Sequence, residues 1–190
     1  MAQFFKANKP KRRGTPSLPA LTIRIDALTL QGQGLCKSHS PIIIVDGALP
    51  GETVKVTVTQ QKKKVWFAKV IQVIEPHSQR IAAPCIYAQG HSSKPMLACG
   101  GCQLQYVEPE ALLELKQTAI TDYATHVLPL NELPWLSPVL SGDNYRRKAR
   151  IAIDARNTAN IKVGFRQAHS NNVLPIDHCL VLDPRLQSVL

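Results

Sequence analysis

Residues 53–59 read TVKVTVT, and this alternation of apolar and polar side chains is typical of a β-strand. The valines stand at every second position and share one face, while the lysine and the threonines between them share the other. Such a strand needs a core on its apolar side and water on its polar side. The sequence around it must therefore supply further strands that complete this core.

Similar strand patterns flank this segment. LTIRIDAL (21–28) alternates in the same way, PIIIVDG (41–47) indicates a more completely buried strand, and VWFAKVIQVIE (65–75) closes the series. Glycines and a proline at turn positions separate these runs. We therefore predict that residues 15–76 form a small, closed or nearly closed β-barrel.

A run of cations falls in the predicted turn between the last two barrel strands. Lys62, Lys63 and Lys64 stand there, directly before Trp66 and Phe67. Lysines of this kind follow a phosphate backbone, and aromatic rings beside them stack on bases. A solvated hairpin tip is an equal alternative for the lysines. Core packing is favoured for the two rings, because adjacent strand residues face opposite sides.

The chain of 190 residues carries a formal net charge of +10, which favours a polyanionic partner, with nucleic acid ahead of an acidic membrane surface. Residues 1–14 hold five of its cations and no acid, and we expect them to form a disordered tail. No apolar run has the length of a signal peptide or a membrane helix, so a cytoplasmic location is expected. In that reducing compartment, clustered cysteines favour metal or redox chemistry over disulfides.

The segment 77–107 loses the strand periodicity and contains cysteines instead. Cys99 and Cys102 are separated by two glycines, which allow a tight turn that brings both thiolates onto one metal centre. Cys85 lies on the same irregular segment, and Cys179 stands far downstream in IDHCLVLDP. These four residues are candidate metal ligands.

Three kinds of site compete for these cysteines. A zinc ribbon normally uses two Cys-x2-Cys pairs, and a thioredoxin-like pair needs a preceding strand; neither feature is present. An iron–sulfur cluster with three local ligands and one distant ligand accepts the spacing. Spacing alone leaves iron–sulfur and zinc equally favoured, with His91 and His178 as substitute ligands for zinc. Cys36, inside a barrel strand, is expected to be a small buried residue.

The segment 108–128 predicts a helix. Pro109 suits its first turn, and Glu108 and Glu110 suit its positive end. An ordinary core helix is the simplest interpretation of its apolar stripe. The stripe consists of Leu112, Leu113, Ala119, Ile120, Tyr123 and Val127.

Residues 141–190 are expected to be rich in β-structure, and NYRRKARIAID (144–154) predicts a strand. On that strand Arg146, Lys148 and Arg150 share one face at intervals of about 7 Å, which suits a phosphate backbone. A solvated face is the alternative, and the net charge favours contact with nucleic acid. The cations predicted to contact RNA are Lys62, Lys63, Lys64, Arg146, Arg147, Lys148, Arg150 and Arg166.

The order of these motifs resembles the N-terminal portion of the bacterial 23S rRNA (uracil-5-)-methyltransferases. A barrel ending in AKVIQVIEP is followed by RIAAPC, CGGCQLQ, YRRKARIAI, VGFRQAHSNNVLPIDHC and LDP, and the likeness covers nearly the whole chain. In that family the barrel is an OB-like, RNA-binding TRAM domain, and the next domain holds a 4Fe-4S cluster on four cysteines. By resemblance, the ligands are Cys85, Cys99, Cys102 and Cys179. The stretch IYAQGHSSKPMLA between the first two is longer than in the family.

The resemblance implies a mainly β fold with some α: a TRAM barrel over 15–76, an incomplete α+β iron–sulfur domain, and a helix over 108–128 that packs on a catalytic domain. The Rossmann-like domain of the family binds S-adenosylmethionine and carries the attacking cysteine, and neither motif occurs in these 190 residues.

The function implied by the resemblance is that of the RNA-recognition and 4Fe-4S portion of an S-adenosylmethionine-dependent 23S rRNA uracil-C5 methyltransferase. This portion is expected to be monomeric and, by itself, inactive. A stand-alone RNA-binding metalloprotein without enzymatic activity, holding iron–sulfur or zinc, is the alternative.

Overall fold

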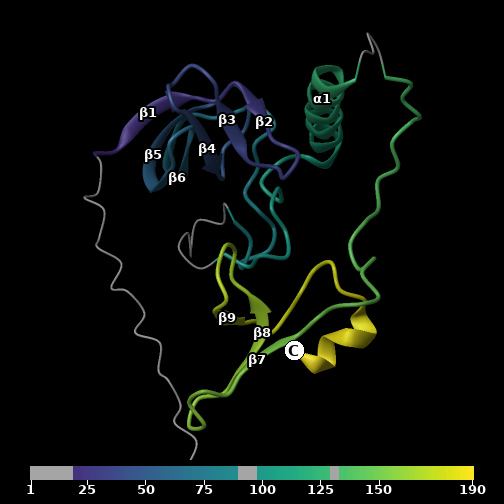
Figure 1. The fold of residues 1–190 in the computed structure, drawn as a ribbon. Coiled ribbons are helices and arrows are strands. Elements are labelled where there is room, and N and C mark those ends of the chain that lie inside the picture. Colours follow the sequence, from purple (N-terminus) through teal and green to yellow (C-terminus); the bar gives the residue numbers. More distant parts are fainter. Residues whose placement is uncertain (1–18, 90–97, 129–132) are drawn as a thin grey trace, which may run out of the picture.

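The structure is a computed structural model that describes residues 19–89, 98–128 and 133–190. A barrel-like sheet stands beside one long helix at one end of the molecule, and a small sheet lies at the other end (Figure 1). The prediction of a mainly β fold with a barrel is confirmed. The tail predicted for residues 1–14, His91 and most of the long stretch before Cys99 lie outside the described residues. None of the described helices has the length and apolarity needed to cross a membrane.

The larger sheet in the described residues has the strand order β1-β5-β6-β4-β3-β2, with β4 and β6 parallel and all other neighbours antiparallel. Its edge strands β1 and β2 are separated in sequence by Ile25 and Asp26 alone. The Ile25 N–H donates to the Glu52 carbonyl at 2.9 Å, and the Asp26 N–H donates to the Leu35 carbonyl at 2.8 Å. The chain thus changes pairing partner here, and the sheet curls back on itself. Its strands are β1 (Leu21–Arg24), β2 (Ala27–Leu28), β3 (Gly34–Cys36), β4 (Ile42–Asp46), β5 (Thr53–Gln61) and β6 (Val65–Glu75).

The barrel core consists of the apolar faces predicted from the alternation. Val54 and Val56 of β5 are completely buried and pack with the strand β4 and with Ile25. Cys36 is also buried in this core, as predicted, and Trp66 packs against it from the side. Burial of this kind stabilises a fold by about 25 cal/mol for each Å² of apolar surface removed from water, so the barrel has a core of its own.

A second core joins the barrel to the segment that follows it. Leu28 and Leu49 of the barrel pack with Tyr106, Val107 and Ala119. Ala119 lies in the helix α1 (Pro109–Val127), which has Pro109 in its first turn and forms as predicted. The helix therefore uses one side of its apolar stripe inside this chain. Ile120, Tyr123 and Val127, on the other side, are exposed.

A buried ion pair fastens the irregular segment to the barrel. The Glu52 carboxylate is fully buried and accepts from the Nε and Nη2 groups of Arg80, at 2.5 and 2.8 Å, and from the backbone of Leu49 and His77. The Arg80 guanidinium lies 4.5 Å from the centroid of the Tyr106 ring. Burial would raise the pKa of Glu52, but these hydrogen bonds together lower it.

The smaller sheet consists of β7 (Ala152–Asp154), β8 (Lys162–Arg166) and β9 (Val173–Pro175), all antiparallel. A 3-10 helix, Pro184–Val189, follows it. Gly164 is required in β8, because a Cβ atom there would stand 2.1 Å from the carbonyl oxygen of Leu174.

The prediction of a strand over residues 144–154 is wrong for most of that length, since β7 begins only at Ala152. Arg146 instead forms an isolated bridge with Leu182: its N–H donates to the Val181 carbonyl, and its own carbonyl accepts from Asp183. This pairing with a distant segment, which local alternation does not encode, separates Arg146 from the sheet.

Candidate functional site

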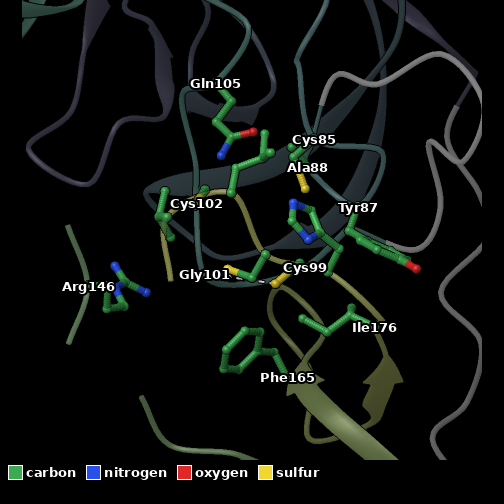
Figure 2. A pocket seen from close by; sticks show the side chains of 14 residues that line it. Cys85, Tyr87, Ala88, Cys99, Gly101, Cys102, Gln105, Arg146, Phe165 and Ile176 are labelled. Carbon is green, nitrogen blue, oxygen red and sulfur yellow. Dashed lines mark hydrogen bonds between the residues drawn. The ribbon is translucent and has the colours of Figure 1, made fainter. Parts of the chain in front are cut away.

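The four cysteines outside the barrel line one pocket, shown in Figure 2. Cys85 comes from the irregular segment after the barrel, Cys99 and Cys102 from the glycine turn, and Cys179 from the segment after β9. All four are half-buried free thiols. The structure thus brings together the residues that the sequence analysis singled out, although they lie far apart along the chain.

Backbone hydrogen bonds hold the CGGC turn on two sides. The Cys99 N–H donates to the Tyr87 carbonyl at 2.7 Å, and the Gly100 N–H donates to the Arg166 carbonyl at 2.9 Å. The Gly101 N–H points at the Cys99 sulfur at 3.4 Å, which is the dashed contact in Figure 2. The turn is therefore fixed between the Cys85 segment and the end of β8.

Two side chains that sequence reasoning missed position the other cysteine segments. The Tyr87 hydroxyl donates to Asp177 at 2.8 Å and so joins the Cys85 segment to the Cys179 segment. The Gln187 side chain accepts from the Cys179 N–H at 3.1 Å and donates to its carbonyl at 2.6 Å. No spacing rule points to the contact of Tyr87 with Asp177, because these two residues lie 90 positions apart, and no pattern pairs Gln187 with Cys179.

The surroundings of the glycine turn favour the thiol form of Cys99 and Cys102. Burial is the largest cause that raises the pKa of Cys99 and of Cys102. Neighbouring cysteines raise both further, while Arg146 beside the pocket acts in the opposite direction on Cys102. Metal binding here would have to release protons, since thiolates are the ligands.

The described side chains do not form a compact site for a single metal ion. Among the residues that the structure describes, no three His, Cys, Asp or Glu side chains stand together closely enough to hold one metal ion. This result opposes a zinc ion on three or four of the cysteines. A 4Fe-4S cluster makes a different demand, because each iron takes one thiolate and the four ligands surround the cluster instead of meeting at a point. The cluster stays a prediction.

The predicted RNA-contacting cations divide into separate groups. Lys62, Lys63 and Lys64 are exposed in the β5–β6 turn, and the Lys62 ammonium lies 5.0 Å from the Phe67 ring centroid. Arg146 is half-buried and lines the cysteine pocket. The predicted exposed row of Arg146, Lys148 and Arg150 is therefore not formed, because the bridge to Leu182 turns Arg146 inward.

The remaining cations are exposed, and two of them line the same groove. Arg147 and Lys148 stand in water before β7. Arg150 and Arg166, from different segments, line one groove beside the glycine turn. Of the predicted contacts, only this pair is brought together by the tertiary structure away from the lysine turn.

Comparison with known proteins identifies the class of the barrel first. Residues 20–71 match the model of the TRAM domain. This range covers most of the curled sheet, from its first strand into β6, and lies within the residues 15–76 predicted to form the barrel.

Curated relatives match most of the chain. A 23S rRNA (uracil(1939)-C(5))-methyltransferase from Alteromonas naphthalenivorans is 41% identical over 170 residues, which cover 88% of this chain and 34% of the relative. The enzyme of the same name from Shewanella baltica is 37% identical over 194 residues and matches 100% of this chain and 40% of its own length. The chain is therefore similar to these methyltransferases and spans no more than about two fifths of their length.

A solved structure shares the fold. The crystal structure of Pyrococcus abyssi tRNA (uracil-54, C5)-methyltransferase in complex with S-adenosyl-L-homocysteine matches 88% of this chain and 34% of its own chain, with a TM-score of 0.55. Its sequence is 20% identical, so the likeness concerns the fold alone.

Proposed function

We propose that this chain is the RNA-recognition and 4Fe-4S portion of an S-adenosylmethionine-dependent 23S rRNA uracil-C5 methyltransferase. The observation that carries the proposal is the pocket in which Cys85, Cys99, Cys102 and Cys179 meet. The names of the relatives and the TRAM match support the rRNA part. The net charge of +10 supports a polyanionic partner.

The pocket fits a 4Fe-4S cluster because it offers four thiol ligands and the rest of its lining is largely apolar. When bound, the cluster supplies iron–thiolate bonds that join three segments with little shared core. Contacts within the chain already hold these segments in place. The Tyr87–Asp177 hydrogen bond connects the Cys85 segment to the Cys179 segment, and the Gln187 side chain binds the backbone of Cys179. In this proposal the cluster is structural and shapes the surface that meets RNA.

We place methyl transfer itself outside these 190 residues. The described residues hold a barrel and a small antiparallel sheet, and they include no parallel sheet covered by helices on both faces, the arrangement that binds S-adenosylmethionine in this family's Rossmann-like domain. The chain alone, mixed with labelled S-adenosylmethionine and 23S rRNA, is expected to transfer no methyl group. Transfer above background would contradict this part of the proposal.

The decisive experiment is purification of the chain without oxygen, followed by metal and sulfide analysis. We expect about four iron atoms and four acid-labile sulfides per chain, with the broad visible absorbance of an iron–sulfur cluster. Cys179→Ser should remove most of this iron, because it takes away the ligand that closes the site. Cys36→Ala is the matched control, since Cys36 lies in the barrel core and should leave the iron content unchanged.

A zinc-stabilised RNA-binding module without enzymatic activity is the second candidate. His178 also lines the pocket and would be the nitrogen ligand of such a site, for which the side chains would have to move closer together than they stand in this structure. A colourless chain that contains about one zinc ion and neither iron nor sulfide would establish this candidate and overturn the first.

A further inference from the structure

A groove of mixed polar and apolar lining lies next to the cysteine pocket, beside the glycine turn. It has a volume of about 490 Å³, within the range of roughly 300–1,000 Å³ that small-molecule sites occupy. Its walls come from the glycine turn, from the start of β7 and from the end of β8 with the residues that follow. Phe165 lines both this groove and the cysteine pocket, so the two share a wall.

Two exposed arginines face this groove from different segments. Arg150 precedes β7, and Arg166 ends β8. In the described residues neither is part of an ion pair, and the Arg166 guanidinium is held by a neutral partner, the side-chain oxygen of Asn171. Their charges are therefore available to an anion. The planar guanidinium group, with its fork of N–H donors, matches the oxygens of a phosphate.

The rest of the lining carries no opposing charge. It includes Gln167, whose side chain is an amide, and no Asp or Glu stands among the described residues that line the groove. An amide presents both a donor and an acceptor, which is what the edge of a nucleobase requires. His169, at the end of the groove, is fixed to the barrel by its contact with Asp46, at 3.1 Å.

We propose that this groove binds a nucleotide of single-stranded RNA, with Arg150 and Arg166 on its phosphates and with Gln167 at the edge of its base. The inference rests on the proposed function and deepens it, because it names the kind of RNA that is bound and where it is bound. A base-paired duplex does not expose a free base edge to such a groove, so unpaired RNA is the ligand.

The test is a binding titration of the intact chain, purified without oxygen, with a labelled oligouridylate of about ten nucleotides, a length that spans one binding module. We expect the double substitution Arg150→Ala/Arg166→Ala to weaken binding by about tenfold or more. It should also reduce the slope of log affinity against log salt by about 1.4, at about 0.7 for each lost phosphate contact on a single strand.

The matched control removes the same charge from the far end of the same sheet. Arg156 and Lys162 are exposed near the tip of the β7–β8 hairpin, which points away from the cysteine segments in Figure 1. Arg156→Ala/Lys162→Ala should leave both the affinity and the salt slope close to those of the wild-type chain. Equal losses of affinity in the two double variants would mean that net charge alone attracts RNA. That result would refute the groove as the binding site.

A second measurement locates the RNA without any substitution. Photo-crosslinking with an oligonucleotide that contains 4-thiouridine should label the peptide that carries Gln167. Crosslinks confined to the barrel would contradict the groove, while RNA binding as such would stand. A wild-type chain that binds neither this probe nor 23S rRNA would instead refute the proposed function.

Discussion

The barrel and the cysteine region are held together in different ways. Ile43, Val45, Val54 and Val56 of the barrel have no exposed surface, whereas all four cysteines of the pocket are half-buried. The strands of the smaller sheet are three to five residues long, and four of the barrel strands are no longer, but β5 and β6 have nine and eleven residues and are interior strands of the barrel sheet. The barrel is therefore stabilised by its own apolar surface. The cysteine region depends on a few specific contacts and, in our proposal, on a cluster.

Polar contacts reinforce the apolar second core that joins the barrel to the segment after it, and single substitutions can test them. Glu52 and Arg80 fix the irregular segment to the barrel, and Tyr87 and Asp177 fix two cysteine segments to each other. For each contact the chain offers a similar side chain at an exposed position. Comparing the two substitutions shows whether the contact itself contributes to the stability of its region.

The largest effect is expected at the joint between the regions. Glu52→Ala leaves the Arg80 guanidinium, whose side chain is 14% exposed, without its anion, and should lower the free energy of unfolding by about 3–5 kcal/mol. Urea unfolding followed by tryptophan fluorescence measures it. Asp154→Ala is the control: its partner Arg156 is already in water, so no measurable loss is expected.

The same variant should change the response to acid. The pKa of Glu52 lies below its ordinary value of 4.5 in the folded chain, so the unfolded chain binds this proton more readily. The contribution of Glu52 is therefore complete above about pH 4.5 and is lost as the pH falls through the folded pKa. Below pH 4.5 the stability gap between the wild type and Glu52→Ala should narrow; a gap that widens there would contradict the assignment.

The next effect lies inside the barrel and tests whether its core stands alone. Ile43→Ala removes a completely buried side chain from β4 and should cost about 2–5 kcal/mol of unfolding free energy. Ile42, its neighbour on the same strand, is 40% exposed, and Ile42→Ala should cost less than about 1 kcal/mol. Similar losses at the two positions would mean that the barrel core is not packed as described.

The smallest effect concerns the cysteine region. Tyr87→Phe removes the hydrogen bond to Asp177, worth about 1 kcal/mol, and should speed amide exchange at Cys99, whose N–H donates to the Tyr87 carbonyl, by about fivefold. Exchange at Val56 in the barrel should not change. Tyr123→Phe, on the exposed face of α1, is the control. If the Val56 amide also exchanges faster, the two regions unfold together, which contradicts their separate stabilisation.

Much of the barrel and the helix α1 was predictable because the signals are local. The alternation in residues 53–59 placed Val54 and Val56 inside, and Pro109 marked the start of the helix. The strand predicted over 144–154 failed because Arg146 pairs with Leu182, a partner that no local pattern reveals. The joint of Glu52 and Arg80 was missed for the same reason, since the two residues lie 28 positions apart and no local pattern pairs them.

The sequence by itself determined the chemistry of the candidate site, because it supplies four cysteines outside the barrel segment. The order of its motifs also indicated a resemblance to the 23S rRNA uracil-C5 methyltransferases, and relatives of that name match most of the chain. The tertiary structure alone decided that the four thiols line one pocket, that Arg146 turns toward it, and that Arg150 and Arg166 line the same groove. The physical reason is distance along the chain: these contacts join segments whose local patterns carry no information about one another.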